Sequence, residues 1–316
     1  RKIADELELN QYGGYVLAFN GGRIVNYKTG EIAYQACVDN EIARKIYDYC
    51  VEKKIGMVTY KDDIVVTGTP VDDYMSLEAR INRMEIVQVE DGKVIFAGDE
   101  AAVCRANIFL RTAERVLLKV GKFRAVTFDE LFEKIKALPW ENYIPSDGKF
   151  WVAKASSVKS KLFSPSDIQS IVKKAMVERL KGVYGLQWFP ETGAEYPIRI
   201  SFMKDEALVC LDTTGLSLHK RGYRTMVSKA PIKETLAAAL ILLTPWKKDR
   251  ILVDPFCGSG TFPIEAAMIA ANMAPGMNRS FTAEKWTNFL PRKGWYEAVD
   301  EAFDLVDDQI ETDIQG

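Results

Sequence analysis

One segment near the end of the sequence combines a short apolar strand, a turn of small residues and an apolar helix. The strand is expected over residues 251–254 and ends in the carboxylate of Asp254, and the helix is expected over residues 262–271. Gly258 and Gly260 lie in the turn, where the absence of a Cβ lets a ligand approach the backbone. The first amides of the helix point toward the same space. This pattern predicts a doubly wound α/β domain with a ligand site beyond the carboxyl end of the strand.

Two common nucleotide-binding patterns do not fit this turn. A P-loop needs a lysine and then a serine or threonine after its glycines, and no such pair follows Gly260. The glycine spacing of the dinucleotide-binding fingerprint is not kept either. The turn therefore predicts a small ligand that is bound neither as in a P-loop nor as in the dinucleotide-binding fingerprint.

Composition indicates a globular chain with two or three cores. The 316 residues are 47% hydrophobic and 27% charged, with a net charge of -2, which excludes disordered and fibrous classes. No stretch approaches the roughly 18 apolar residues that span a bilayer, and no leader begins the sequence, so a cytoplasmic location is expected. The five cysteines have no paired spacing and there is one histidine. We therefore expect no metal site, no disulfide framework and no histidine-activated nucleophile.

The charge is unevenly distributed along the chain. The net charge is -3 over residues 1–86, +5 over residues 87–224 and -4 over residues 225–316. Residues 148–166 carry four lysines and no acid, and interpreted as a loop they would present ammonium and hydroxyl groups to a phosphate backbone. A second basic cluster occupies residues 219–224. A solvated surface without a ligand is the alternative for both clusters.

Local patterns predict several further elements. Asp39 is expected to cap a helix, and Thr127 with Glu130 three residues later predicts a capping box. Phe281 and Trp286 fit either a core position or a ligand contact. The other expected elements are strands over 15–19, 23–25, 31–34, 93–96, 196–202 and 207–212 and a helix over 164–180.

The first part of the chain predicts an α+β module. Its stretch Phe19-Asn20-Gly21-Gly22, with the residues from Tyr74 to Met84, resembles the Cof-type sugar phosphatases of the haloacid dehalogenase-like superfamily. That family uses an aspartate nucleophile in a D-x-D-G-T motif and a later D-D motif for magnesium, and neither occurs here. The resemblance therefore implies a cap-like fragment without phosphatase activity.

Several runs of residues in the remainder recur together in one known family. The runs are Arg105-Ala106-Asn107, residues 110–118, residues 127–132, Pro139-Trp140, residues 157–160, residues 219–224 and residues 254–261. On these runs, the chain from about Gly92 onward resembles the bacterial THUMP-domain ribosomal RNA guanine-N2 methyltransferases. The resemblance implies S-adenosylmethionine as the cofactor and ribosomal RNA as the partner.

The resemblance also implies which residues bind each ligand. The expected cofactor-binding residues are Asp254, Pro255, Phe256, Cys257, Gly258, Ser259, Gly260, Thr261, Lys233, Glu234 and Thr235. The expected RNA-binding residues are Lys154, Ser157, Lys159, Ser160, His219, Lys220, Arg221 and Arg224. The family's Asn-Pro-Pro-Tyr-type strand end, which accepts the target amine, is not found in the sequence, so no catalytic residue is assigned and the catalytic motif is expected to be missing.

The expected fold is a multi-module α/β and α+β chain. Its expected modules are a haloacid dehalogenase cap-like fragment over 1–86, a ferredoxin-like module over 87–148, a THUMP RNA-binding module over 149–224 and the first part of a Rossmann-like class I methyltransferase domain over 225–316. The expected function is methylation of guanine N2 in 23S ribosomal RNA. A non-catalytic RNA-binding protein and a phosphatase relic are the alternatives.

Overall fold

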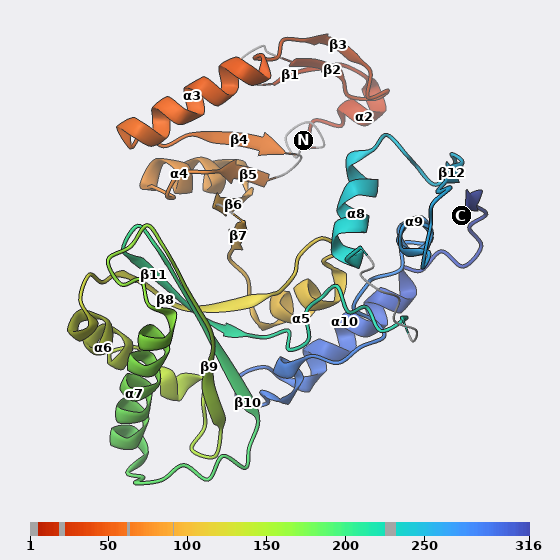
Figure 1. The fold of residues 1–316 in the computed structure, drawn as a ribbon. Coiled ribbons are helices and arrows are strands. Elements are labelled where there is room, and N and C mark those ends of the chain that lie inside the picture. The colour runs from red at the N-terminus through yellow and green to blue at the C-terminus, as the bar shows by residue number, and fades with distance from the viewer. Residues whose placement is uncertain (1–5, 19–22, 62–63, 91, 225–231) are drawn as a thin grey trace. The chain divides into compact units, whose positions relative to one another are not determined.

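The computed structural model describes residues 6–18, 23–61, 64–90, 92–224 and 232–316. The chain divides into two compact units, Arg1–Ala97 and Gly98–Gly316 (Figure 1). The stretch Phe19-Asn20-Gly21-Gly22, which carries part of the phosphatase resemblance, lies outside the described residues. None of the described helices has the length and hydropathy needed to cross a membrane.

The first unit contains two small sheets. The antiparallel sheet β1-β2-β3 confirms the three strands expected at its start, and the side chain of Asp39 caps α3 by accepting a hydrogen bond from the amide of Glu41 at 2.8 Å. The second sheet has the order β4-β5-β6-β7, with β5 and β6 parallel and the other pairs antiparallel. The elements are α2 (Leu9–Tyr12), β1 (Tyr15–Ala18), β2 (Arg23–Asn26), β3 (Ile32–Gln35), α3 (Asn40–Lys53), β4 (Val58–Lys61), β5 (Ile64–Thr67), α4 (Asp73–Asn82), β6 (Glu85–Glu90) and β7 (Lys93–Phe96).

The second unit begins with a helix and a four-stranded sheet. The sheet has the order β8-β11-β10-β9, in which β9 and β10 are parallel and the other pairs antiparallel. Figure 1 shows α6 and α7 together on one side of this sheet. The elements are α5 (Glu100–Phe109), β8 (Leu117–Arg124), α6 (Phe128–Lys136), η2 (Trp140–Asn142), β9 (Lys149–Val158), α7 (Pro165–Tyr184), β10 (Glu195–Met203) and β11 (Glu206–Asp212).

Buried apolar side chains shared by the sheet and its helices explain why they form one layer pair. The side chains of Phe150 and Ile198 on the sheet and of Ile168 and Met176 on α7 are at most 1% exposed, so they form one apolar core between sheet and helices. The interpretation of the basic stretch as a loop is wrong over residues 149–158, because these residues form the edge strand β9.

The start of α6 follows the predicted cap with one difference. The hydroxyl of Thr127 accepts a hydrogen bond from the amide of Glu130 at 3.2 Å, as expected. The Glu130 carboxylate accepts from the amide of Val126 at 2.8 Å, one residue before the position that a capping box uses. The first bond satisfies an amide that a helix start leaves without a partner, and the second pairs the amide of the residue before the cap.

The C-terminal elements confirm the predicted strand-turn-helix. The strand β12 pairs in parallel with β13, with Leu252 opposite Ile314 and Val253 opposite Gln315, and helices lie between them in the sequence. Parallel strands joined through helices are the unit of a doubly wound sheet. The elements are α8 (Glu234–Leu243), β12 (Leu252–Val253), α9 (Thr261–Ala270), η3 (Thr282–Lys285), α10 (Arg292–Asp304) and β13 (Ile314–Gln315).

Buried contacts connect these C-terminal elements to the four-stranded sheet. Trp286 stacks on Tyr196 of β10 with ring centroids 5.1 Å apart, and its indole N–H donates to the carbonyl of Glu195 at 2.8 Å. Trp286 and Phe281 are both buried, so they are core residues rather than ligand contacts. The backbone of Gly276 lies directly against α5, where a Cβ would come within 2.6 Å of the Asn107 carbonyl oxygen. This close contact requires glycine.

Candidate functional site

The turn between β12 and α9 exposes its backbone on one side. Gly258 and Gly260 have φ angles of +56° and +71°, the left-handed region that favours glycine. A Cβ on Gly258 would meet only the carbonyl oxygen of Phe256, at 3.9 Å, so the space above this residue is open. The turn is closed by a hydrogen bond of 2.8 Å from the Gly260 amide to the Cys257 carbonyl.

Asp254 stands at the end of β12 and orients the start of the turn. Its backbone amide donates to the carbonyl of Gln315 at 2.9 Å, and one oxygen of its carboxylate accepts from the amide of Phe256 at 3.1 Å. Within the described part of the chain, the second carboxylate oxygen accepts no hydrogen bond. The turn and this carboxylate fit a ligand that carries ammonium or hydroxyl donors, as S-adenosylmethionine does.

Arg224 connects this turn to a second feature of the site. Its guanidinium donates to the hydroxyl of Thr261, the first residue of α9, at 2.6 Å. The same group forms an ion pair of 3.3 Å with Glu234, the first residue of α8. Both carboxylate and guanidinium are largely buried. One side chain therefore fixes the start of α8 relative to the start of α9.

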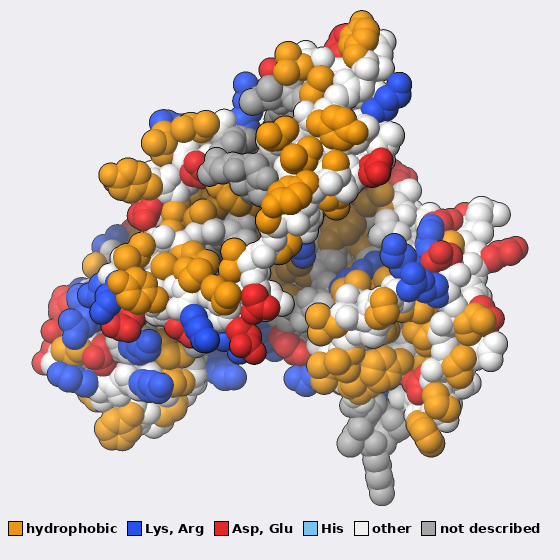
Figure 2. Space-filling view, turned by 90° about the horizontal axis from the view of Figure 1, so that it is seen from above, with side chains coloured by type: hydrophobic (Ala, Val, Ile, Leu, Met, Phe, Trp, Pro, Cys, Tyr) orange, Lys and Arg blue, Asp and Glu red, His pale blue; other side chains and the backbone are white. Residues whose placement is uncertain are grey.

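The second feature is a basic cavity of about 520 Å³ next to Arg224. Five of its lining residues carry a permanent positive charge and one carries a negative charge, Glu234. Figure 2 shows Lys and Arg side chains at several places on the face that is seen from above, among hydrophobic and acidic side chains. The lining residues are Leu216, His219, Lys220, Arg221, Gly222, Arg224, Ile232, Lys233, Glu234, Arg279 and Ser280.

Arg221 forms the inner wall of this cavity, and its guanidinium is bonded to protein groups. It forms an ion pair with Glu265 of α9, and it donates to the carbonyls of Leu218 at 3.0 Å and of Arg111. The residue is 3% exposed. The structural role of this guanidinium is a finding, and its predicted direct contact with RNA stays a prediction.

Glu114 is a site residue that the sequence interpretation missed. Its carboxylate accepts hydrogen bonds from Ser217 at 2.7 Å and Thr235 at 2.8 Å, and it lies 3.5 Å from the ammonium of Lys233 and 3.4 Å from His219. Burial alone would raise the pKa of Glu114, but these hydroxyl, ammonium and imidazole partners together lower it to about 2. The carboxylate is therefore charged at neutral pH. Its partners lie 103 to 121 residues away in the sequence, so no local pattern could identify it.

The segment at the start of α8 makes protein contacts rather than facing the glycine turn directly. Thr235 is 3% exposed and bonded to Glu114, and Glu234 is paired with Arg224. The ammonium of Lys233 reaches the cavity, with 59% of its side chain exposed. Cofactor binding by these three residues stays a prediction, whereas the position of Lys233 and Glu234 in the lining of the cavity is a finding.

The other predicted RNA-binding residues lie on β9 and in the turn that follows it. Lys154 and Lys159 are exposed, and Lys159 adopts a φ of +49°. The hydroxyl of Ser157 donates to the carbonyl of Leu162 at 2.5 Å, and that of Ser160 accepts from the amide of Asp205 at 2.9 Å. The two serines thus close the turn, and the two lysines are the groups of this set that face solvent.

Comparison with known protein families matches three parts of the chain. Residues 75–117 match the RlmL ferredoxin-like domain, residues 125–212 match the THUMP domain, and residues 221–314 match the RMKL-like methyltransferase domain. The chain contains ferredoxin-like, THUMP and methyltransferase-like domains. The predicted ferredoxin-like, THUMP and methyltransferase module types are confirmed, and the module boundaries expected at residues 86, 148 and 224 stay predictions. The glycine turn and the basic cavity lie mainly in the methyltransferase-like domain.

Individual relatives agree with these domains. A candidate RNA methyltransferase, YpsC of Bacillus subtilis, is 59% identical over 213 residues, which are 67% of this chain and 55% of that protein. The ribosomal RNA large subunit methyltransferase K/L of Magnetococcus marinus is 34% identical over 67% of this chain and 30% of that enzyme. The crystal structure of SMU.472, a candidate methyltransferase complexed with SAH, has a TM-score of 0.68 and 46% identity, covering 76% of this chain and 64% of that one. The chain thus spans about half the length of YpsC and less of the K/L enzyme.

The comparisons do not support the expected resemblance of residues 1–84 to phosphatases. The overlap with a haloacid dehalogenase-like hydrolase of Bacteroides thetaiotaomicron has a TM-score of 0.27 and covers 31% of this chain, which is too little to carry an argument. Among the described residues, no group of three or more His, Cys, Asp or Glu side chains is arranged to hold a metal ion. The phosphatase-like character of this unit stays a prediction.

Proposed function

We propose that this chain provides the RNA-binding and donor-binding parts of an S-adenosylmethionine-dependent methyltransferase that acts on ribosomal RNA. The observation that carries the proposal is the position of Arg224, which is bonded to Thr261 at the glycine turn and to Glu234 at the basic cavity. A site for a small donor and a site suited to an anionic polymer therefore share one residue.

The glycine turn has the properties that such a donor requires. S-adenosylmethionine supplies a methyl group that its sulfonium already activates, so the protein has to position the reactants rather than activate them. Gly258 leaves space for close approach to the backbone, and Asp254 offers a carboxylate oxygen to a donor group of the ligand. α9 starts directly after the turn, and the N-terminus of a helix favours a carboxylate.

The THUMP domain and the basic cavity provide separate surfaces for RNA. Lys154 and Lys159 are exposed on the THUMP domain, and Lys220 and Lys233 line the cavity. Ammonium groups bind phosphates and make affinity depend on salt. The relative named as a large-subunit ribosomal RNA methyltransferase supports ribosomal RNA as the substrate class, and guanine N2 of 23S ribosomal RNA is the position that we propose.

Nucleoside analysis after reaction tests this function. The protein is incubated with S-adenosylmethionine carrying a deuterated methyl group and a transcript of 23S ribosomal RNA, which is then digested and analysed by mass spectrometry. We expect any labelled nucleoside to be N2-methylguanosine, with a yield at least about tenfold lower for Gly258→Ala. Labelled N6-methyladenosine would contradict the proposed position. Because the strand end that accepts the target amine is expected to be missing from this chain, binding of both ligands without transfer agrees with the proposal. Binding of the RNA without binding of the donor would contradict it and favour the non-catalytic alternative.

A further inference from the structure

The cations of the basic cavity are of two kinds. Arg279 donates to the carbonyls of Ser217 and Lys220, each at 2.8 Å, and to that of Leu216. Arg221 and Arg224 are bonded to Glu265 and to Glu234. These three guanidinium groups hold the backbone and the two helices, so they form the wall of the cavity.

Lys220, Lys233 and His219 are placed differently. Lys220 is exposed, and no carboxylate of the described residues lies within 4.0 Å of its ammonium. Lys233 and His219 contact a single carboxylate, that of Glu114, at 3.5 Å and 3.4 Å. These three side chains line the cavity and retain donors that can bind a ligand.

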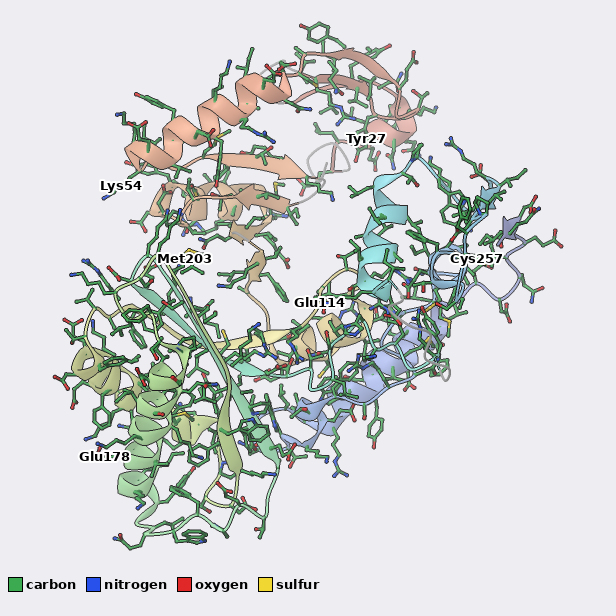
Figure 3. The ribbon with its side chains drawn as sticks, viewed as in Figure 1. Tyr27, Lys54, Glu114, Glu178, Met203 and Cys257 are labelled. Atoms are coloured by element: carbon green, nitrogen blue, oxygen red, sulfur yellow. The ribbon has the colours of Figure 1, made fainter. Side chains whose placement is uncertain are left out.

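Glu114 determines where two of these donors lie. It comes from the segment between α5 and β8, and it bonds both to the loop of Ser217 and His219 and to Thr235 in the first turn of α8. Figure 3 shows Glu114 beside that end of α8. One carboxylate therefore connects the two sides of the cavity.

We propose that the cavity is a subsite for one phosphate group of the RNA backbone, bound by Lys220, Lys233 and His219, with Glu114 as the positioning residue that holds two of them. This inference rests on the proposed function. A cavity of about 520 Å³ admits a phosphate with its attached sugar. Compact ammonium groups suit a phosphate as point charges. Because Arg224 joins the cavity to Thr261, the bound phosphate would fix a neighbouring nucleotide beside the donor turn.

Removing the Glu114 carboxylate distinguishes two roles, the positioning of Lys233 and His219 and a general effect of its negative charge on RNA binding. Glu114→Ala makes the protein more positive by one charge, so long-range electrostatics alone predict tighter RNA binding. Loss of positioning predicts weaker binding instead. Glu178→Ala is a matched control, because Glu178 also pairs with a lysine, at 2.9 Å, and its side chain is 50% exposed against 47% for Glu114. Glu178 lies on α7, away from the cavity.

The measurement is binding of a fluorescent 23S ribosomal RNA fragment over a range of salt concentrations. We expect Glu114→Ala to weaken binding about tenfold and Glu178→Ala to leave it equal or tighter. We expect Lys220→Ala and Lys233→Ala each to reduce the slope of log affinity against log salt by about 1. Thermal melting of each variant confirms that it is folded. Tighter binding by Glu114→Ala, or unchanged slopes for both lysine variants, would overturn the proposal.

Further outcomes distinguish an RNA phosphate from the carboxylate of S-adenosylmethionine as the anion in the cavity. If Lys220→Ala and Lys233→Ala lose affinity for S-adenosylmethionine and keep their affinity for RNA, the cavity binds the donor's carboxylate and the proposal is wrong. Failure of the wild-type protein to bind the RNA would refute the proposed function itself. If Lys154→Ala weakens RNA binding while both cavity lysine variants bind as the wild type does, only the subsite is refuted.

Discussion

Arg221 and Glu265 form an ion pair that is almost completely removed from solvent. The guanidinium Nε lies 3.3 Å from the carboxylate Oε1, and the two side chains are 1% and 0% exposed. The hydroxyl of Tyr223 donates to the same carboxylate at 3.1 Å, and burial first, with the charge of Glu265 next, raises the pKa of that hydroxyl. Glu265 lies one turn into α9. The pair therefore connects the basic segment to the helix that follows the glycine turn.

Removing one partner of this pair should be costly. Arg221→Met leaves Glu265 buried without its counter-ion, and such a loss destabilises a fold by roughly 3–5 kcal/mol. The double variant Arg221→Met with Glu265→Leu should recover much of this loss, because it removes both charges of the buried pair. Urea denaturation measures both effects.

An exposed ion pair provides the control for that experiment. Lys293 and Glu297 pair at 3.3 Å with side chains 82% and 63% exposed, so Lys293→Met should change the free energy of unfolding by less than about 1 kcal/mol. If Arg221→Met were no more destabilising than Lys293→Met, the buried pair would not have the structural role that we assign to it.

Gly258→Ala should impair donor binding more than folding. The new Cβ meets open space, so the fold bears only the strain of a left-handed φ, roughly 1–2 kcal/mol. The same Cβ occupies the space into which the donor would come, and we expect its affinity to fall at least about tenfold. Calorimetry of S-adenosylmethionine binding and thermal melting measure the two effects.

Gly182→Ala is the matched substitution. Gly182 lies inside α7, and a Cβ at this position would meet no atom within 4 Å, so alanine should stabilise the helix by roughly 0.5–1 kcal/mol and leave donor affinity unchanged. Equal donor affinity for Gly258→Ala and Gly182→Ala would show that the turn does not bind the donor.

Cys257 should report the occupancy of the turn. It lies between Asp254 and Gly258 in the sequence and is half-buried. Cys37 is exposed, and Cys104 is buried. Burial raises the pKa of the Cys104 thiol to about 11, so little thiolate forms there. We expect alkylation at Cys37 and, more slowly, at the half-buried Cys50 and Cys257, and expect S-adenosylmethionine to protect Cys257 alone. Equal protection of Cys37 and Cys257, or protection of neither, would not agree with a donor site in this turn.

The local elements were predictable because their signals lie close together in the sequence. Asp39 and Thr127 cap helices through bonds to amides two and three residues ahead, and the strand over 93–96 is where its pattern placed it. The glycine turn was found for the same reason. These features depend on residues that are near neighbours in the chain.

The cavity was not predictable because its residues come together only through tertiary packing. Glu114 contacts the loop before Lys220 and the start of α8, and no periodicity relates these positions. Burial likewise decides that Arg221 is a structural residue whereas Lys220, its neighbour in the sequence, faces solvent. The lysines of residues 149–158 were interpreted as a loop because charge alone does not reveal that these residues pair in parallel with β10.

The contribution of Glu114 to the stability of the fold should depend on pH. Its pKa of about 2 in the folded protein lies below the ordinary glutamate pKa of 4.5, so its network stabilises the fold fully above about pH 4.5. This contribution is lost as the pH falls toward 2, where the folded protein also binds the proton. We expect Glu114→Gln to be less stable than the wild type at pH 6 by a margin that shrinks steadily below about pH 4.5. Urea denaturation across this range measures the margin, and a constant margin would contradict the assignment.

The central claim is that residues 254–261 bind a methyl donor beside a basic cavity for RNA. Isothermal titration of S-adenosylmethionine into the wild-type protein, alone and with the 23S ribosomal RNA fragment already bound, tests this claim most directly. We predict saturable heat at one site in both titrations, with an affinity at least about tenfold lower in Gly258→Ala. The absence of heat from folded wild-type protein, or the same heat from Gly258→Ala, would contradict the claim.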